Sequence, residues 1–317
     1  MWTLFRIAAR NVLRNRRRTL ITLAALLVGV GVMVSIRGLL SGFQRGLVLG
    51  VVQGLTEFLP VSSSGHLALV PWLFDWQTFA TEADATSFDA ALHVGTFAAV
   101  VVAMRGDLAP LLRAGVRSIG APSRAVKDPV ARRAWLVVLS AIPAGLAGLV
   151  LRDVIADRLG GPVAVAVSLI VFGIVLGWAD RRPTRRSGDD LGVRDSLVIG
   201  CLQVLALNPG TSRSGITIAA ARLLGYERAA AVRLSFLVGI PIVGAAGAFE
   251  AIDVLRGGVA SGIVAPLVVG VVAAFLSGWL AIRVLVTLAT MRSFAPFVTY
   301  RVVLGVVVLL IVASGLR

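Results

Sequence analysis

The sequence predicts an all-α protein that crosses a lipid bilayer several times. Of its 317 residues, 57% are apolar and only 15% are charged, which is too little polar surface to enclose a water-soluble globule. The apolar residues gather in runs of about 18 or more, the length of helix that spans a bilayer core. The single cysteine excludes a disulfide framework and a cysteine-based metal site. A soluble enzyme, a secreted scaffold and a zinc module are therefore excluded.

Seven apolar runs are long enough to be membrane spans. They cover residues 19–36, 87–104, 134–151, 162–179, 229–248, 263–286 and 299–316. The first run follows a cluster of arginines in 14–18 and precedes no clear small-residue cleavage site, which favours an uncleaved anchor over a signal peptide. We therefore expect a basic segment and an anchor helix over residues 1–45, followed by a polytopic membrane domain with about six spans over 46–317.

Two other apolar stretches, 46–74 and 196–224, are each interrupted in the middle by proline, glycine and a cluster of serines. Unsatisfied backbone groups are costly in hydrocarbon, so such breaks survive only where protein or a water-filled cavity surrounds them. Both stretches are therefore predicted to be re-entrant helical hairpins.

The two predicted hairpins look like copies of one unit. Residues 46–65 and 196–215, aligned without a gap, are identical at eight of twenty positions, including a glutamine and the Ser-x-Ser-Gly end. Three predicted spans separate the copies, an odd number, so the second copy enters the membrane from the opposite face. The sequence thus predicts an inverted-topology repeat, with halves of about 46–179 and 196–317, and a polar site near the midplane where the breaks meet.

The charge of the chain is strongly positive, with 31 basic and 16 acidic residues and a formal net charge of +15. In a soluble domain this balance would suggest nucleic acid, but here the arginines lie between the apolar runs and set orientation instead. With residues 1–18 inside and each hairpin returning to its own side, the inside segments carry 19 basic residues and the outside segments carry six. This count places the basic loops 105–133 and 180–195 on the inner face, and no nucleic-acid partner is expected.

The first hairpin contains an acid deep in an apolar stretch, Glu57. Burial of an ionisable group at that depth costs free energy, so such a residue usually has a function. The alternative is a carboxylate that is paired with a structural arginine. Gln53, four residues earlier, shares its helical face. The pair is therefore a candidate functional cluster.

The two histidines of the chain differ in their surroundings. His66 follows the serines of 62–64, and its imidazole suits work as a base or a nucleophile, unless it is a hydrogen-bonded packing residue. His93 has Asp89 one turn earlier but fewer polar neighbours in the sequence than His66, and it is interpreted as structural.

The second hairpin contains the stretch NPGTSRSG over 208–215, just before a helix predicted to begin near Ile216. Backbone N–H groups at a helix start, together with serine and threonine hydroxyls and a forked guanidinium, form a phosphate cradle. The alternative is a capped helix with a snorkelling Arg213. Opposed across one site, the first hairpin suits a divalent cation and proton transfer, and the second suits phosphate oxygens. Together they indicate phosphoryl-group chemistry on a substrate that lives in the membrane.

The stretches QGLTEFLPVSSSGHL (53–67) and NPGTSRSG (208–215) resemble the bacterial undecaprenyl-diphosphatases of the bacitracin-resistance type. The resemblance covers about residues 46–317. Supporting stretches are FDAALHVGTFAAV (88–100), IPAGLAGL (142–149), RLSFLVGIPIVGAAG (233–247) and RSFAPFVTYRVVLG (292–305).

This resemblance implies a membrane enzyme that hydrolyses undecaprenyl diphosphate to undecaprenyl phosphate and inorganic phosphate. Such an enzyme recycles the lipid carrier of cell-wall synthesis, confers bacitracin resistance and opens its site to the outer face of the bacterial plasma membrane. The resemblance also implies a divalent cation, Mg or Ca, held by Glu57 and Gln53. The oligomeric state is left open, a homodimer being one form that the chain can take.

Site roles follow from the same resemblance. The catalytic residues are expected to be Glu57, Ser63, His66 and Arg213, and whether His66 or a serine attacks phosphorus is left open. The substrate phosphates are expected to contact Ser62, Ser64, Gly210, Thr211, Ser212, Ser214 and Thr217.

Residues 1–45 depart from the family pattern. The stretch 6–36 instead resembles the first segment of an ABC-transporter permease of the lipoprotein-release type. Only this segment matches, so a permease function is unsupported, and a natural fusion and a misassigned start both stay open. A transporter or flippase of an anionic lipid is the alternative function, because inverted repeats with broken helices are a transporter architecture. The carboxylate and the imidazole beside the phosphate cradle favour the enzyme.

Overall fold

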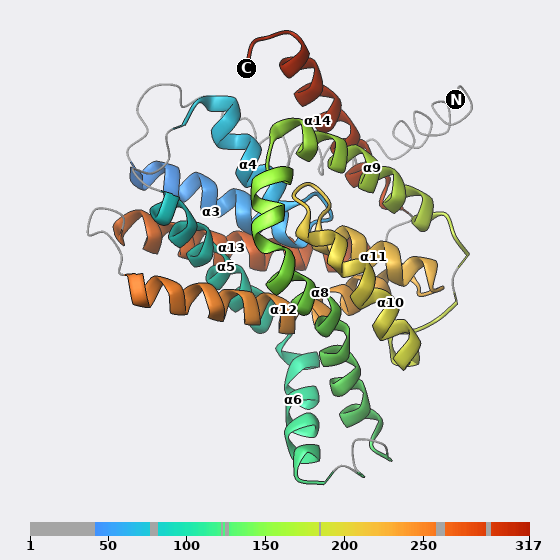
Figure 1. Cartoon of the computed structure of the whole chain (residues 1–317). Coiled ribbons are helices and arrows are strands. Elements are labelled where there is room, and N and C mark those ends of the chain that lie inside the picture. The colour runs from blue at the N-terminus through green and yellow to red at the C-terminus, as the bar shows by residue number, and fades with distance from the viewer. Residues whose placement is uncertain are drawn as a thin grey trace.

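The structure is a computed structural model, which describes residues 42–76, 82–121, 123, 127–183, 185–257, 264–289 and 293–317. Over these residues the chain is almost entirely helical and forms no strand (Figure 1). The predicted all-α architecture is therefore confirmed. The predicted anchor helix over 19–36 lies outside the described residues.

Five described helices contain segments long and apolar enough to cross a membrane. They are α8 (Pro129–Leu159), α9 (Pro162–Asp180), α12 (Arg228–Gly257), α13 (Val264–Ala289) and α14 (Ala295–Ala313). A sixth span is counted when α5 (Glu82–Ala103) and α6 (Arg105–Ile119), bent by 88° from each other, are taken as one broken span. The chain is thus a multi-pass membrane protein, and its spans lie where the apolar runs between 87 and 316 predict them.

The segment 105–133 is not the loop that the sequence analysis expected. It forms α6 and the first turns of α8, which pack against each other and project from the rest of the described structure (Figure 1). The indole of Trp135 donates a hydrogen bond of 2.8 Å to the hydroxyl of Ser118 and joins the two helices. Several of the basic residues that suggested a loop therefore lie on an amphipathic helix, whose buried side includes Leu111.

The first broken hairpin consists of α3 (Gly42–Phe58) and α4 (Ser63–Phe74). The break is a short turn that ends at Ser62, whose φ is 79°. The Ser62 hydroxyl accepts a hydrogen bond of 3.3 Å from the backbone N–H of Gly65 and so caps α4. A positive φ is strained for a serine, and such strain persists only where the surroundings hold it.

The second broken hairpin repeats this design. It consists of α10 (Val193–Gln203), a 3₁₀ turn over Val204–Leu207 and α11 (Arg213–Leu223). Ser212 has a φ of 73°, and its hydroxyl accepts a bond of 3.1 Å from Gly215 N–H. Because Ser212 is the cap, α11 begins at Arg213, three residues before the predicted start. The equivalent strained caps at both breaks support the interpretation of the hairpins as a repeat.

Small residues bring α3 against α13. A Cβ atom added to Gly46, Gly50 or Gly54 would lie 2.6, 2.4 or 2.1 Å from an atom of Pro266, Gly270 or Ser277, respectively. Such glycine spacing lets helix backbones approach closely in a membrane. The contact fixes α3, which carries Glu57, against a full span.

Ion pairs outside the predicted spans fix the entry to the second hairpin. Asp195 accepts hydrogen bonds from Arg186 Nη2 at 2.5 Å and from the Tyr226 hydroxyl at 2.7 Å. Burial alone would raise the pKa of Asp195, but these two bonds and the Arg186 charge outweigh it and hold the pKa below its ordinary value. Asp180, at the end of α9, accepts a bond of 2.6 Å from Arg228 Nε. Two buried carboxylates, each paired with a partly exposed arginine, thus join the loop to the helix ends.

Candidate active site

The breaks of the two hairpins lie in direct contact. The N–H of Gly210 donates a hydrogen bond of 3.1 Å to the Ser62 hydroxyl, and the Ser214 hydroxyl donates one of 3.0 Å to the carbonyl of Leu59. Gly210 is required at its position because its φ is 92° and an added Cβ would lie 2.5 Å from the carbonyl oxygen of Val165. The two turns therefore form one junction, as the sequence predicted.

The carboxylate of Glu57 is the centre of this junction. Its Oε1 accepts a hydrogen bond of 3.1 Å from Arg213 Nη2. Its Oε2 accepts one of 2.5 Å from the Ser63 hydroxyl and one of 3.2 Å from Gln53 Nε2. The structure thus brings four of the predicted site residues together on one carboxylate, in a position that is only 8% exposed.

The guanidinium of Arg213 lies between Glu57 and α12. Its Nη1 is 3.5 Å from the carbonyl oxygen of Ser235, and its Nε is buried without a partner in the described part of the chain. The Thr217 hydroxyl bonds the Arg213 carbonyl at 2.8 Å and the Ser235 hydroxyl at 2.6 Å, which holds the start of α11 on α12. Because an arginine has five N–H donors, Arg213 has donors left for an anion beside Glu57.

The other predicted phosphate ligands differ in their hydrogen bonds to the protein and in their exposure. The hydroxyls of Ser62 and Ser212 cap helices, and each also lies within 3.4 Å of the hydroxyl two residues later. Thr211 is fully buried, and its hydroxyl has no hydrogen-bond partner among the described residues. Ser64 is exposed. The contacts of Ser62, Ser64, Gly210, Thr211, Ser212, Ser214 and Thr217 with phosphate stay predictions.

His66 is buried, and both of its ring nitrogens have partners. Nδ1 lies 2.6 Å from the carbonyl oxygen of Ser62, and Nε2 lies 2.6 Å from the hydroxyl of Tyr300 on α14. The two rings are nearly parallel, with an interplanar angle of 7° and centroids 5.6 Å apart. His93, which the sequence analysis interpreted as structural, bonds the Asp89 carbonyl at 2.8 Å and also interacts electrostatically with Glu57.

Arg301, next to Tyr300, is a residue that the sequence analysis missed. It is fully buried, and its guanidinium donates hydrogen bonds of 2.8 to 3.2 Å to four backbone carbonyls. The acceptors are Leu169, Pro60, Gly210 and Thr211, so one side chain joins α9 to both hairpin breaks. The signal for Arg301 in the sequence is a charged residue inside an apolar span, where an ionisable group is rare.

The side chains at the junction fit a hard divalent cation in part. No group of three or more His, Cys, Asp or Glu side chains suited to a metal occurs among the described residues. The fitting donors are the Glu57 carboxylate and Gln53 Oε1, which is buried with no partner in the part of the chain described. Magnesium is often held by one or two carboxylates while substrate phosphates supply further oxygens. The site therefore suits a cation that binds together with a phosphate ligand.

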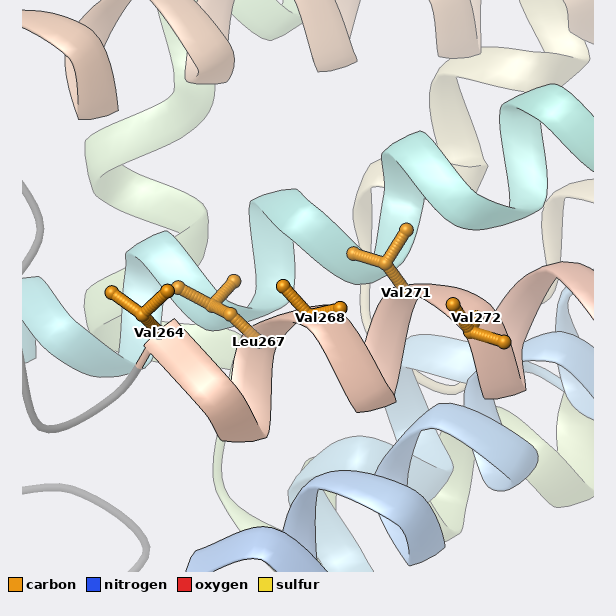
Figure 2. A pocket seen from close by; sticks show the side chains of 5 residues that line it. All are labelled: Val264, Leu267, Val268, Val271 and Val272. Carbon is orange, nitrogen blue, oxygen red and sulfur yellow. The ribbon is translucent and has the colours of Figure 1, made fainter.

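An apolar groove lies on α13, away from these polar groups. It has a volume of about 350 Å³ and is lined by Val264, Leu267, Val268, Val271 and Val272. Figure 2 shows these five side chains along one side of α13. None of the polar residues of the junction lines the groove, so its surface suits hydrocarbon and not a phosphate.

The sequence is similar to known proteins over most of its length. A family model described as bacitracin resistance protein BacA matches residues 46–307. An undecaprenyl-diphosphatase of Thermomicrobium roseum is 43% identical over 277 residues, which cover 85% of this chain and 98% of that protein. An undecaprenyl-diphosphatase of a Nocardioides species is 42% identical over 275 residues, with 86% and 97% covered. A protein of Streptomyces avermitilis named undecaprenyl-diphosphatase 2 is 41% identical over 291 residues, with 87% and 96% covered.

Proposed function

The chain belongs to the bacitracin resistance protein BacA family, and we propose that it is an undecaprenyl-diphosphatase whose active site is the junction of its two broken hairpins. It hydrolyses undecaprenyl diphosphate to undecaprenyl phosphate and inorganic phosphate, and this activity accounts for bacitracin resistance. The observation that carries the site assignment is the contact of Glu57 with both Ser63 and Arg213. It joins a base, a hydroxyl and a guanidinium in a buried position.

In the first step, the Ser63 hydroxyl attacks the terminal phosphorus of the diphosphate. Glu57 Oε2, 2.5 Å from the hydroxyl, takes its proton as the new oxygen–phosphorus bond forms. The bond between the terminal phosphorus and the bridging oxygen breaks, and the bridging oxygen leaves on undecaprenyl phosphate. Arg213 stabilises the negative charge that spreads over the transferring phosphoryl oxygens.

In the second step, a water molecule attacks the phosphoserine. The bond between phosphorus and the Ser63 oxygen breaks, and Glu57 returns to that oxygen the proton that it took in the first step. The attacking water keeps its two hydrogens on the inorganic phosphate that leaves, so Glu57 and Ser63 are restored. The sequence left open whether His66 or a serine is the nucleophile. Support for Ser63 comes from its bond to a carboxylate, whereas both ring nitrogens of His66 bond to protein groups.

A divalent cation, Mg or Ca, is part of the proposal. Glu57 and Gln53 Oε1 are the residues that would hold it. When bound, such an ion neutralises charge on the diphosphate oxygens. The polyprenyl tail lies against lipid-facing helices, for which the α13 groove offers an apolar surface. The site opens to the outer face of the bacterial plasma membrane, and the chain can act there as a monomer or a homodimer.

The test is release of inorganic phosphate from a polyprenyl diphosphate by the purified full-length protein in detergent. Detergent removes the compartments that a transporter or flippase needs, so phosphate release separates the enzyme from that alternative. We expect release by the wild type, loss of release with a chelator, and recovery with added Mg²⁺ or Ca²⁺. No release by the folded protein with either ion would contradict the proposed function.

Arginine variants test the site. Arg213→Ala is expected to abolish release because it removes the guanidinium on Glu57. Arg233→Ala is the matched control, since Arg233 is an exposed arginine on α12 that forms an ion pair of 3.8 Å with Asp107, itself partly exposed. Equal activity of the two variants would remove the support for the junction as the active site.

A further inference from the structure

We propose that Tyr300 is a positioning residue for this active site. Its hydroxyl fixes the His66 imidazole, and through it the turn that presents Ser63 to Glu57. This inference rests on the proposed function for its kinetic consequence, but the arrangement itself can be measured independently. It also assigns His66 a supporting role, where the sequence left open a nucleophile or a base.

The hydrogen bonds of His66 define its tautomer. The Ser62 carbonyl can only accept, so the proton of the contact at 2.6 Å belongs to His66 Nδ1. In the neutral ring Nε2 is then an acceptor, and the Tyr300 hydroxyl at 2.6 Å is the donor. Among the described residues, His66 is the hydrogen-bond partner of that hydroxyl. Tyr300 thus holds the imidazole in one tautomer and one orientation.

The imidazole in turn holds a strained turn. The carbonyl that Nδ1–H bonds belongs to Ser62, whose φ of 79° is unfavourable for a side-chain-bearing residue. Ser63 follows directly and bonds Glu57 Oε2. The chain of contacts therefore runs from Tyr300 through His66 and Ser62 to Ser63.

The position of Tyr300 is itself fixed. Its neighbour Arg301 donates to the carbonyls of Pro60 and Gly210, one in each hairpin break. Because α14 is tied to both breaks, the Tyr300 hydroxyl is placed against His66 in a fixed geometry. For His66 Nε2 to attack phosphorus, its hydrogen bond with the Tyr300 hydroxyl would have to break. This arrangement favours Ser63 as the nucleophile.

The first experiment reads the tautomer by NMR of isotope-labelled histidine in detergent micelles. The chain has two histidines, so the His66→Asn variant assigns the signals. We expect neutral His66 with its proton on Nδ1, and a changed Nε2 signal in Tyr300→Phe. Tyr226→Phe is the matched control, because Tyr226 is the other tyrosine and its hydroxyl bonds Asp195, away from His66. A proton on Nε2 in the wild type, or an unchanged Nε2 signal in Tyr300→Phe, would overturn the proposal.

The second experiment is a double-mutant cycle on phosphate release. Tyr300→Phe is expected to lower kcat about tenfold and leave KM within about twofold, as loss of one positioning hydrogen bond does. An asparagine amide can replace Nδ1 as donor to the Ser62 carbonyl, so His66→Asn should retain more activity than His66→Ala. In the His66→Asn background, Tyr300→Phe should have no further effect. The same factor in both backgrounds, or equal loss in the two His66 variants, would overturn the proposal. A wild type that releases no phosphate would refute the proposed function, while the NMR result still decides the arrangement.

Discussion

At the scale of single residues, the account depends on how Glu57 is paired. The carboxylate bonds Arg213 through one oxygen and Ser63 and Gln53 through the other. In the proposed mechanism each bond has a separate role: the Arg213 guanidinium pairs with the carboxylate and faces a phosphate, and the Ser63 hydroxyl attacks phosphorus with its base already in place. A buried carboxylate without these partners would be costly and inert.

Replacement of Ser63 by alanine is expected to lower kcat by about a thousandfold or more, because the attacking oxygen is removed. The measurement is phosphate release under saturating lipid diphosphate, with Ser314→Ala at the exposed end of the chain as the control. Rapid quench of the wild type should trap phosphate on the Ser63 side chain, located within the peptide that also contains His66. Phosphate found on His66 would reassign the nucleophile.

We expect the main effect of replacing Arg301 to be a loss of folding stability. Arg301→Met leaves four buried carbonyls without their donor, and we expect it to lower the free energy of unfolding by about 3 kcal/mol or more. Arg283→Met is the control, because Arg283 is exposed and lies over the Trp279 ring, a contact worth about 1 kcal/mol or less. Thermal unfolding in detergent measures both. Equal melting temperatures for the two variants would show that Arg301 does not join the breaks.

The site residues that the sequence predicted are those with a local signal. Glu57 is an acid in an apolar stretch, and Arg213 lies in a turn rich in hydroxyls, so each could be selected without knowledge of the fold. Tyr300 could not, because its partner His66 is 234 residues away and an isolated tyrosine on an apolar helix is ordinary. Only the packing of α14 against the junction reveals it.

At the scale of helices, the two hairpins are placed by their neighbours. α3 lies on α13 through glycines, and on α10 an added Cβ at Gly200 would lie 2.5 Å from the Ser140 carbonyl on α8. The corresponding glycine of each repeat thus faces a full span. Close backbone approach takes the place of the side-chain packing that a soluble protein uses.

Gly50→Ala tests this contact, since its Cβ would lie 2.4 Å from the Gly270 carbonyl oxygen and 2.9 Å from the Ala273 Cβ. We expect α3 to shift and the protein to lose about 1–3 kcal/mol of stability, together with activity. Gly106→Ala has no atom within 4 Å of its Cβ and is the control. A Gly50→Ala protein that is as stable and as active as the control would exclude this packing.

The sequence predicts the membrane spans and the two hairpins, but it does not predict α6. Long apolar runs and the Pro-Gly-Ser breaks identified the spans and hairpins, because membrane burial leaves few alternatives for such segments. The basic residues of 105–133 predict a loop on the inner face, whereas α6 is a helix whose apolar residues, at helical spacing, pack against α8. The distribution of Lys and Arg predicts on which side of the membrane a segment lies, but it does not predict whether that segment is helical.

At the scale of the whole molecule, the site exists because two halves of the chain meet. Glu57 and Arg213 are 156 residues apart, and neither hairpin alone carries both the carboxylate and the guanidinium. The family match begins at residue 46, and α3 begins at Gly42. The matched residues thus include both hairpins and the junction between them.

Deletion of residues 1–41 should leave phosphate release per folded molecule unchanged, because the contacts of the junction among the described residues are made by side chains beyond that segment. The measurement compares kcat and KM of the truncated and full-length proteins in the same detergent, after gel filtration to confirm that both are folded. A large loss of kcat in a folded truncated protein would assign the N-terminal segment a part in catalysis.

In the proposed mechanism, Glu57 and Arg213 act as one unit on one substrate. The most direct measurement is a double-mutant cycle with Glu57→Gln and Arg213→Lys, read as kcat/KM for phosphate release from a polyprenyl diphosphate. The account predicts that each single variant loses most of the activity and that the double variant is little worse than either, because the unit is already broken. Losses that multiply in the double variant, or a wild-type rate in either single variant, would contradict it.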